Sequence, residues 1–266
     1  MRATATISSW LPWLKPFLPR LVLLEEKAAE LYHLSLLGKA FAPSLHAQTV
    51  FGTEKAGKSM EQLHLHLLQQ GFQKRSLQDT QSFNNGQVYF RGDLGFLRFV
   101  IPQVKSRQKP PRVGLAVQPS RKALLLLENP HAVEVKYLGA SYEVQIPQVG
   151  RFILAEGLEL KTESRNSPLD IFESAKSLAL IMDLLAQNDD LQKEALNDLA
   201  EIRPPALLRE FKENLRRHGP GSILWESAQK LFDQNHPGTP GVVLTRWYWK
   251  FLPILSKTLL SLREDV

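Results

Sequence analysis

Apolar and polar positions along the first half of the chain alternate between helical and strand-like spacing. Residues 25–41 and 60–70 place apolar side chains three or four positions apart, which predicts two helices. Pro43 ends the first of these helices, and Gly71 ends the second. The apolar run at residues 123–127 predicts a further, short helix. Short apolar runs predict strands at residues 46–51, 87–91, 96–101, 133–137 and 142–146.

After Pro147 the pattern becomes helical throughout. Ser167 and Pro168 form a typical helix start, with Ser as the N-cap and Pro at the first helical position. Pro and Gly clusters separate the helices that follow. The later helices are predicted at residues 191–202, 206–217, 222–234 and 242–263. The predicted fold class is therefore α+β, with a mixed-sheet domain at residues 25–147 and an all-helical domain at residues 148–266.

The composition is that of an ordinary globular protein. Of 266 residues, 43% are apolar and 23% are charged. The sequence contains no Cys, which excludes disulfides, thiolate metal sites and Cys nucleophiles. Pro12, Lys15, Pro16 and Pro19 interrupt the apolar residues near the N-terminus, so the pattern predicts neither a signal peptide nor a membrane span. We expect a cytoplasmic protein.

The positive charge is concentrated in one segment, residues 74–122. This segment holds ten Lys or Arg residues and only two acids, Asp79 and Asp93, an excess of eight positive charges. The whole chain has a net charge of only +6. Because Lys and Arg neutralise phosphates and release their counterions, we predict that the basic segment binds a nucleotide or a nucleic acid.

Residues 92–160 carry the most specific order of motifs. They read GDLGFLRFVIP, an apolar helix that ends in Glu-Asn-Pro, the strand GASYEVQIP and a helix start of the form Pro-x-x-x-Arg-Phe. This order resembles a bacterial family of nucleotidyltransferase-fold proteins, the broad group that includes the AbiEii-like toxins. The resemblance covers residues 30–190 and implies a nucleotidyltransferase-like α/β domain followed by a helical domain.

The resemblance also implies where metal-binding carboxylates would stand. Nucleotidyl transfer commonly uses two Mg²⁺ ions, which prefer carboxylate ligands. The family pattern has a Gly-rich helix start, an Asp-x-Asp strand and a third Asp on a later strand. In this chain Gly38 and Lys39 stand at the helix start, Gln48 and Val50 at the Asp pair, and Arg98 at the third Asp.

The carboxylates that catalysis needs are therefore missing. Residues 33–53 contain no Asp or Glu, whatever the alignment, and Arg98 would repel Mg²⁺. An Arg at this position can instead meet a phosphate directly. We predict a catalytically degenerate protein without a cofactor or metal, which binds a nucleotide, a nucleic acid or a protein partner. The binding residues that we predict are Gly38, Lys39, Gln48, Arg98 and, from the family's helix start, Arg151.

Two alternatives remain open. The first is an active, Mg²⁺-dependent nucleotidyltransferase that acts on RNA, a protein or a small molecule. The second is a phosphate-binding loop, because residues 52–59 match the pattern G-x-x-x-x-G-K-[ST] between a predicted strand and a predicted helix. In that case Gly52, Gly57, Lys58 and Ser59 would cradle the phosphate. His64 and His66 lie two positions apart on the same helix and so do not face one another as metal ligands would.

Overall fold

The computed structural model divides the chain into two compact units. Unit 1 comprises Met1–Thr80 and Asn84–Pro147, and unit 2 comprises Gln81–Phe83 and Gln148–Val266. The structure describes residues 7–37, 48–54, 58–76, 87–103, 117–120, 122–159, 177–178, 181, 184–185, 188–202, 209–210 and 213. The helices predicted at residues 206–217, 222–234 and 242–263 and the helix start at Ser167 lie outside these ranges, apart from single residues.

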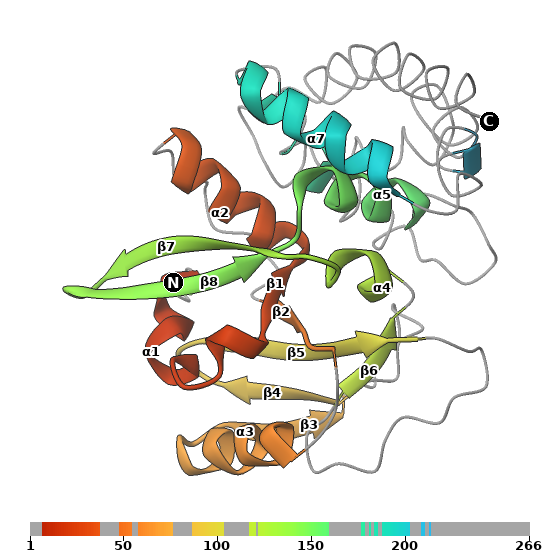
Figure 1. Ribbon diagram of the computed structural model, residues 1–266. Coiled ribbons are helices and arrows are strands. Elements are labelled where there is room, and N and C mark those ends of the chain that lie inside the picture. The colour runs from red at the N-terminus through yellow and green to blue at the C-terminus, as the bar shows by residue number, and fades with distance from the viewer. Residues whose placement is uncertain are drawn as a thin grey trace, which may run out of the picture. The chain divides into compact units, whose positions relative to one another are not determined.

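Unit 1 is built on an eight-stranded mixed sheet (Figure 1). The strands follow the order β3-β4-β5-β2-β1-β8-β7, and β6 pairs with β5. β2 and β6 run parallel to β5, and β1 runs parallel to β8, whereas the remaining pairs are antiparallel. The strands are β1 Val22–Leu24, β2 Gln48–Gly52, β3 Gln73–Ser76, β4 Gln87–Arg91, β5 Gly95–Pro102, β6 Val117–Ser120, β7 His131–Tyr137 and β8 Ala140–Ile146.

Most of the predicted elements in unit 1 are confirmed. The five predicted strands correspond to β2, β4, β5, β7 and β8. The three predicted helices correspond to α2 Glu25–Leu37, α3 Lys58–Gln69 and α4 Ala123–Leu126. Gly71, which follows α3, has a φ of +81°, a conformation that favours glycine. A mixed α/β unit is therefore shown, as the hydrophobic pattern predicts.

The pattern does not predict the segment before residue 25, which contributes to the core. It forms the short helices η1 Ile7–Trp10, α1 Leu11–Leu14 and η2 Leu18–Arg20, and then β1. Trp10, Leu11 and Leu14 are at most 1% exposed. β1 lies in the sheet between β2 and β8, so the predicted boundary at residue 25 leaves out an interior strand.

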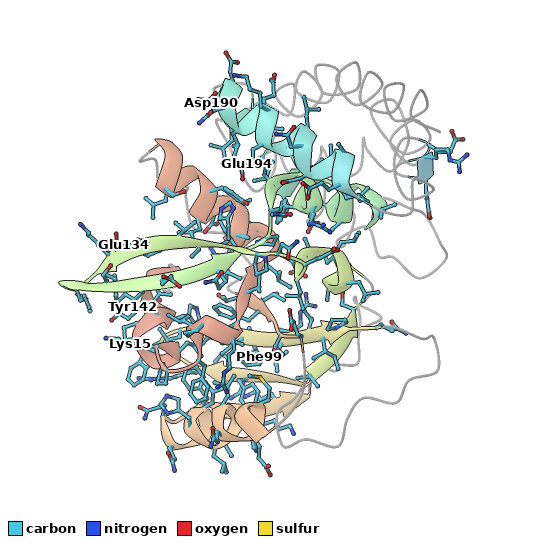
Figure 2. The ribbon with its side chains drawn as sticks, in the orientation of Figure 1. Lys15, Phe99, Glu134, Tyr142, Asp190 and Glu194 are labelled. Atoms are coloured by element: carbon cyan, nitrogen blue, oxygen red, sulfur yellow. The ribbon has the colours of Figure 1, made fainter. Side chains whose placement is uncertain are left out.

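One face of the sheet, which we call the Phe99 face, is packed with aromatic rings. Phe99 of β5 stacks on Phe51 of β2 and meets the ring of Tyr89 of β4 edge-on. All three rings are fully buried, and Figure 2 shows Phe99 inside unit 1. Helix α3 covers this face, because His64 Nδ1 lies 2.7 Å from the Tyr89 hydroxyl. Residues on the Phe99 face alternate with those on the opposite face, which we call the Arg98 face.

In unit 2, helices α5 Val149–Glu159 and α7 Asp189–Glu201 pack closely. The Gly150 N–H at the start of α5 donates a hydrogen bond of 2.9 Å to Asp198 Oδ2 of α7. A Cβ atom on Gly150 would lie 2.5 Å from the backbone oxygen of Ala195, so only glycine allows this approach. The predicted helix at residues 191–202 is confirmed by α7. None of the described helices has the length and hydropathy that crossing a bilayer requires.

Candidate functional site

Three charged side chains meet on the Arg98 face of unit 1 and form what we call the Arg98 cluster. Arg98 Nη2 donates a hydrogen bond of 2.6 Å to Glu25 Oε1. Lys122 Nζ lies 3.5 Å from the same carboxylate oxygen. The side chains of Arg98 and Lys122 are each 17% exposed, and that of Glu25 is 28% exposed. The three side chains are thus mostly buried, but part of each remains accessible to solvent.

The register of three strands explains how these residues meet. Leu24 of β1 pairs with Val50 of β2, and Val50 pairs with Arg98 of β5. Two strand spacings separate Leu24 from Arg98, about 10 Å in all. Glu25 follows Leu24 directly, and the long Arg98 side chain spans the gap from the other side. Lys122 enters from the residue before α4, next to the parallel strand β6.

The backbone of Glu25 has an uncommon conformation. Its φ is +57°, which a residue other than Gly, Asn or Asp seldom adopts. This residue is the point at which β1 ends and α2 begins. The positive φ turns the chain sharply out of the strand, and the two ion pairs hold the carboxylate at the turn. Backbone strain at such a point is a common property of functional residues.

The electrostatics of the cluster favour a charged carboxylate. Burial by itself raises the pKa of Glu25, but the charges of Arg98 and Lys122 and their hydrogen bonds outweigh it and lower the pKa. Two cations, Arg98 and Lys122, therefore face the Glu25 carboxylate. Arg98 Nε is buried and has no hydrogen-bond partner among the described residues. A donor of this kind is costly to leave unpaired.

The structure brings together some of the predicted site residues. Val50 and Arg98 are direct partners on adjacent strands. Gln48 pairs with Phe96, two positions from Arg98 on β5. Gly38 and Lys39 lie outside the described residues. The pairing of β2 with β5 therefore brings positions 48, 50 and 98 close together along two adjacent strands.

Arg151 belongs to unit 2. Its side chain is buried within α5, and its Nε donates a hydrogen bond of 2.8 Å to Gln148 Oε1. A guanidinium that is 3% exposed offers little surface to a ligand. Its described contacts are those of a residue that stabilises the start of α5.

Sequence reasoning missed Glu25 as a site residue. Residues 33–53 contain no Asp or Glu, but Glu25 precedes this stretch. It reaches the cluster from the end of β1, a strand that the hydrophobic pattern does not predict. In the described part of the chain, no three His, Asp or Glu side chains gather as metal ligands. The donor set of the Arg98 cluster does not fit Mg²⁺, because two cations surround a single carboxylate. A signal for Glu25 does exist in the sequence, since an acid directly after a short apolar run is typical of a helix N-terminus.

Residues 52–59 lie between a strand and a helix, as the phosphate-loop alternative expects. The strand is not part of a parallel sheet, however. β2 ends at Gly52, and α3 begins at Lys58. β2 lies between a parallel and an antiparallel neighbour rather than within a parallel sheet. Gly52 has a packing role, because a Cβ there would lie 2.5 Å from Leu127 Cδ2 and 3.0 Å from Leu24 Cδ1. Gly57 and the side chains of Lys58 and Ser59 lie outside what the structure describes.

The cations of the basic segment have different surroundings. Arg91 stacks on the Trp13 ring, 4.1 Å from its centroid, and pairs with Asp93 at 2.9 Å, so it has a structural role. Arg75 on β3 is exposed. The remaining cations of the segment, apart from Lys74, Arg98 and Lys122, lie outside the described residues. Of the described cations, Arg98 and Lys122 are the two that converge on one point.

No family model matches the chain, and no curated protein or solved structure is significantly similar to it. The function of this chain is therefore inferred from its own residues and from the geometry of the Arg98 cluster.

Proposed function

We propose that this chain is a nucleotidyltransferase-like protein that has lost its catalytic metal centre and binds a phosphate-bearing ligand, a nucleotide or a nucleic acid. The proposal depends mainly on one observation. Two cations, Arg98 and Lys122, converge on a single carboxylate at the strand pair where the resemblance expects metal-binding Asp residues. The same position that would hold Mg²⁺ in an active relative is occupied by positive charge from the protein.

The chemistry of the cluster suits phosphate. An Arg presents several N–H donors in a planar fork, which matches the oxygens of a phosphate group. Glu25 uses only part of this fork, because Arg98 Nε remains without a partner among the described residues. In the unliganded protein, Glu25 holds the two cations in place. A phosphate that carries two negative charges would compete with this single carboxylate for them.

The same geometry argues against catalysis. Metal-assisted phosphoryl transfer requires carboxylates that bridge the metal ions. Glu25 is the one acid in the Arg98 cluster, and both of its cationic neighbours would oppose a bound Mg²⁺. We therefore expect that ligand binding needs no divalent cation and that no nucleotide is consumed.

Calorimetric titration with ATP and GTP, in EDTA and then in Mg²⁺, tests this proposal. Arg98→Met and Lys122→Met should each weaken binding about tenfold or more, because each removes a charge-assisted hydrogen bond to phosphate. Lys193→Met is the matched control, since Lys193 is exposed on α7 and pairs only weakly with Asp190. Equal losses in all three variants, or a strict requirement for Mg²⁺, would overturn the proposal.

A further inference from the structure

Two aromatic rings lie next to each other on the Arg98 face, away from the aromatic core. Phe90 of β4 and Phe96 of β5 are register partners, and their ring centroids are 4.8 Å apart at an angle of 43°. Arg75 of β3 lies over Phe90, with Cζ 4.1 Å from the ring centroid. The three residues form a short strip across three strands, which we call the Phe90 strip.

The alternation of side chains places the strip on the same face as Arg98. Phe96 is two positions before Arg98 on β5, so both point to one side of the sheet. Tyr89 precedes Phe90 on β4 and Phe99 follows Arg98 on β5, so both point to the other side of the sheet, which α3 covers. Along β5, Phe96 and Arg98 are about 7 Å apart. The strip therefore continues directly into the Arg98 cluster.

The rings of the strip differ from those of the core in their exposure. Phe51, Tyr89 and Phe99 are fully buried, whereas Phe90 and Phe96 are both only partly buried. Arg75 is exposed. Partly exposed aromatic rings on neighbouring strands, with an Arg stacked on one of them, provide flat surfaces on which a nucleobase can stack.

We propose that the Phe90 strip binds the bases of a single-stranded nucleic acid. This inference depends on the proposed function, because the Arg98 cluster would hold a phosphate of the same strand. Bases stack on Phe96 and on the Arg75 guanidinium that covers Phe90, and Arg98 contacts the backbone at one end of the strip. The excess of eight positive charges over residues 74–122 favours a polyanion as the occupant. A duplex would not fit, because its bases are already stacked on one another.

Fluorescence anisotropy with labelled oligouridylate and oligothymidylate, each about ten nucleotides long, tests this inference. Phe90→Leu with Phe96→Leu keeps the apolar bulk and removes the stacking surface. The double variant should bind both oligomers about tenfold or more weakly. Tyr137→Leu is the matched control, because Tyr137 is a partly buried aromatic residue at the other edge of the sheet, on β7. Its affinity for the oligomers should equal that of the parent.

A second probe, inorganic tripolyphosphate, separates the two proposals because it has no base. The Phe90/Phe96 double variant should bind tripolyphosphate as the parent does, whereas Arg98→Met should bind it more weakly. If Arg98→Met does not change the affinity for tripolyphosphate, the Arg98 cluster does not bind phosphate. If the double variant binds the oligomers as tightly as the parent, or if a duplex of the same length competes equally, the Phe90 strip does not bind the bases of a single strand.

Arg75→Gln keeps the test decisive if the double variant unfolds. Arg75 is exposed and its side chain contacts Phe90 and Gln73, so this substitution leaves the core unchanged. It should weaken oligomer binding severalfold and leave tripolyphosphate binding within twofold of the parent. Unchanged oligomer affinity in Arg75→Gln would contradict the inference.

Discussion

Arg98 on β5 donates a hydrogen bond of 2.6 Å to the carboxylate of Glu25, a residue 73 positions earlier at the start of α2. Arg98 is on β5 and Glu25 follows β1, and β2 lies between these two strands, so the ion pair reaches across β2. With Lys122 it makes a site in which the protein supplies its own counter-anion. On the proposed function, a ligand phosphate competes with Glu25 for the two cations, and this competition yields the first prediction.

Glu25→Gln should increase the affinity for nucleotides and lower the stability of the protein. Without its charge, residue 25 competes less with phosphate for Arg98 and Lys122, so we expect an affinity several times higher in calorimetric titration. The same substitution should cost about 1 kcal/mol of unfolding free energy, because it removes partly exposed ion pairs. An unchanged or lower nucleotide affinity in a folded Glu25→Gln protein would contradict the account.

The pH dependence of stability should report on Glu25. Burial raises the pKa of Glu25, but Arg98 and Lys122 outweigh it, and the pKa is lowered. A lowered folded-state pKa stabilises the protein above the ordinary carboxyl pKa, and this contribution is lost as the pH falls through the lowered value. Denaturant unfolding between pH 3 and pH 7 should therefore show a smaller acid destabilisation in Glu25→Gln than in the parent. Parallel pH profiles for the two proteins would show that the ion pairs contribute no stability.

Asp198 in unit 2 should have the opposite pH dependence. Burial raises its pKa, although the hydrogen bond from the Gly150 N–H lowers it. A raised folded-state pKa means that stability falls as the pH rises from the ordinary carboxyl value through the raised one. Asp198→Asn keeps an acceptor for Gly150 and should remove this loss, whereas Asp198→Ala should cost about 1–2 kcal/mol. Thermal unfolding at several pH values distinguishes these results, and an Asn variant as unstable as the Ala variant would contradict them.

Substitutions at Gly52 and Lys58 distinguish the Arg98 cluster from the phosphate-loop alternative. If Gly52 is needed for packing against Leu127 and Leu24, Gly52→Ala should cost about 1–3 kcal/mol of stability through overpacking. Lys58→Ala should leave nucleotide affinity unchanged within error. A large loss of ATP or GTP binding in Lys58→Ala would favour the phosphate loop over the Arg98 cluster.

Short-range patterns in the sequence account for much of unit 1. The β4–β5 and β7–β8 pairs are each joined by a short turn, so the alternation of their residues predicts them. β1 has only three residues, all buried, and shows no alternation that would identify a strand. β3 is a polar edge strand whose residues Gln73, Lys74 and Arg75 are exposed, so no hydrophobic pattern indicates it.

The candidate site could be predicted only in part, because it depends on the order of the strands. The sequence singles out Arg98 and positions 48 and 50, and the register of β2 with β5 places these positions on adjacent strands. The partners Glu25 and Lys122 come from opposite ends of unit 1's sequence. Their meeting requires β1, β2, β5 and β6 to be placed side by side, which no local pattern specifies. The Phe90 strip likewise depends on the register between β4 and β5.

The most direct test of the central claim is the salt dependence of oligouridylate binding by the parent, Arg98→Glu and the double variant Arg107→Glu/Arg112→Glu. Arg107 and Arg112 belong to the basic segment but lie outside the described residues. If they only add phosphate contacts, each should lower the slope of log affinity against log salt by about 0.7–0.9. Arg98→Glu should do more than this and abolish binding even at low salt, because it places two carboxylates at the point where phosphate is held. If Arg98→Glu lowers the slope by no more than half of what the Arg107→Glu/Arg112→Glu double variant does, or not at all, the Arg98 cluster is not the phosphate site.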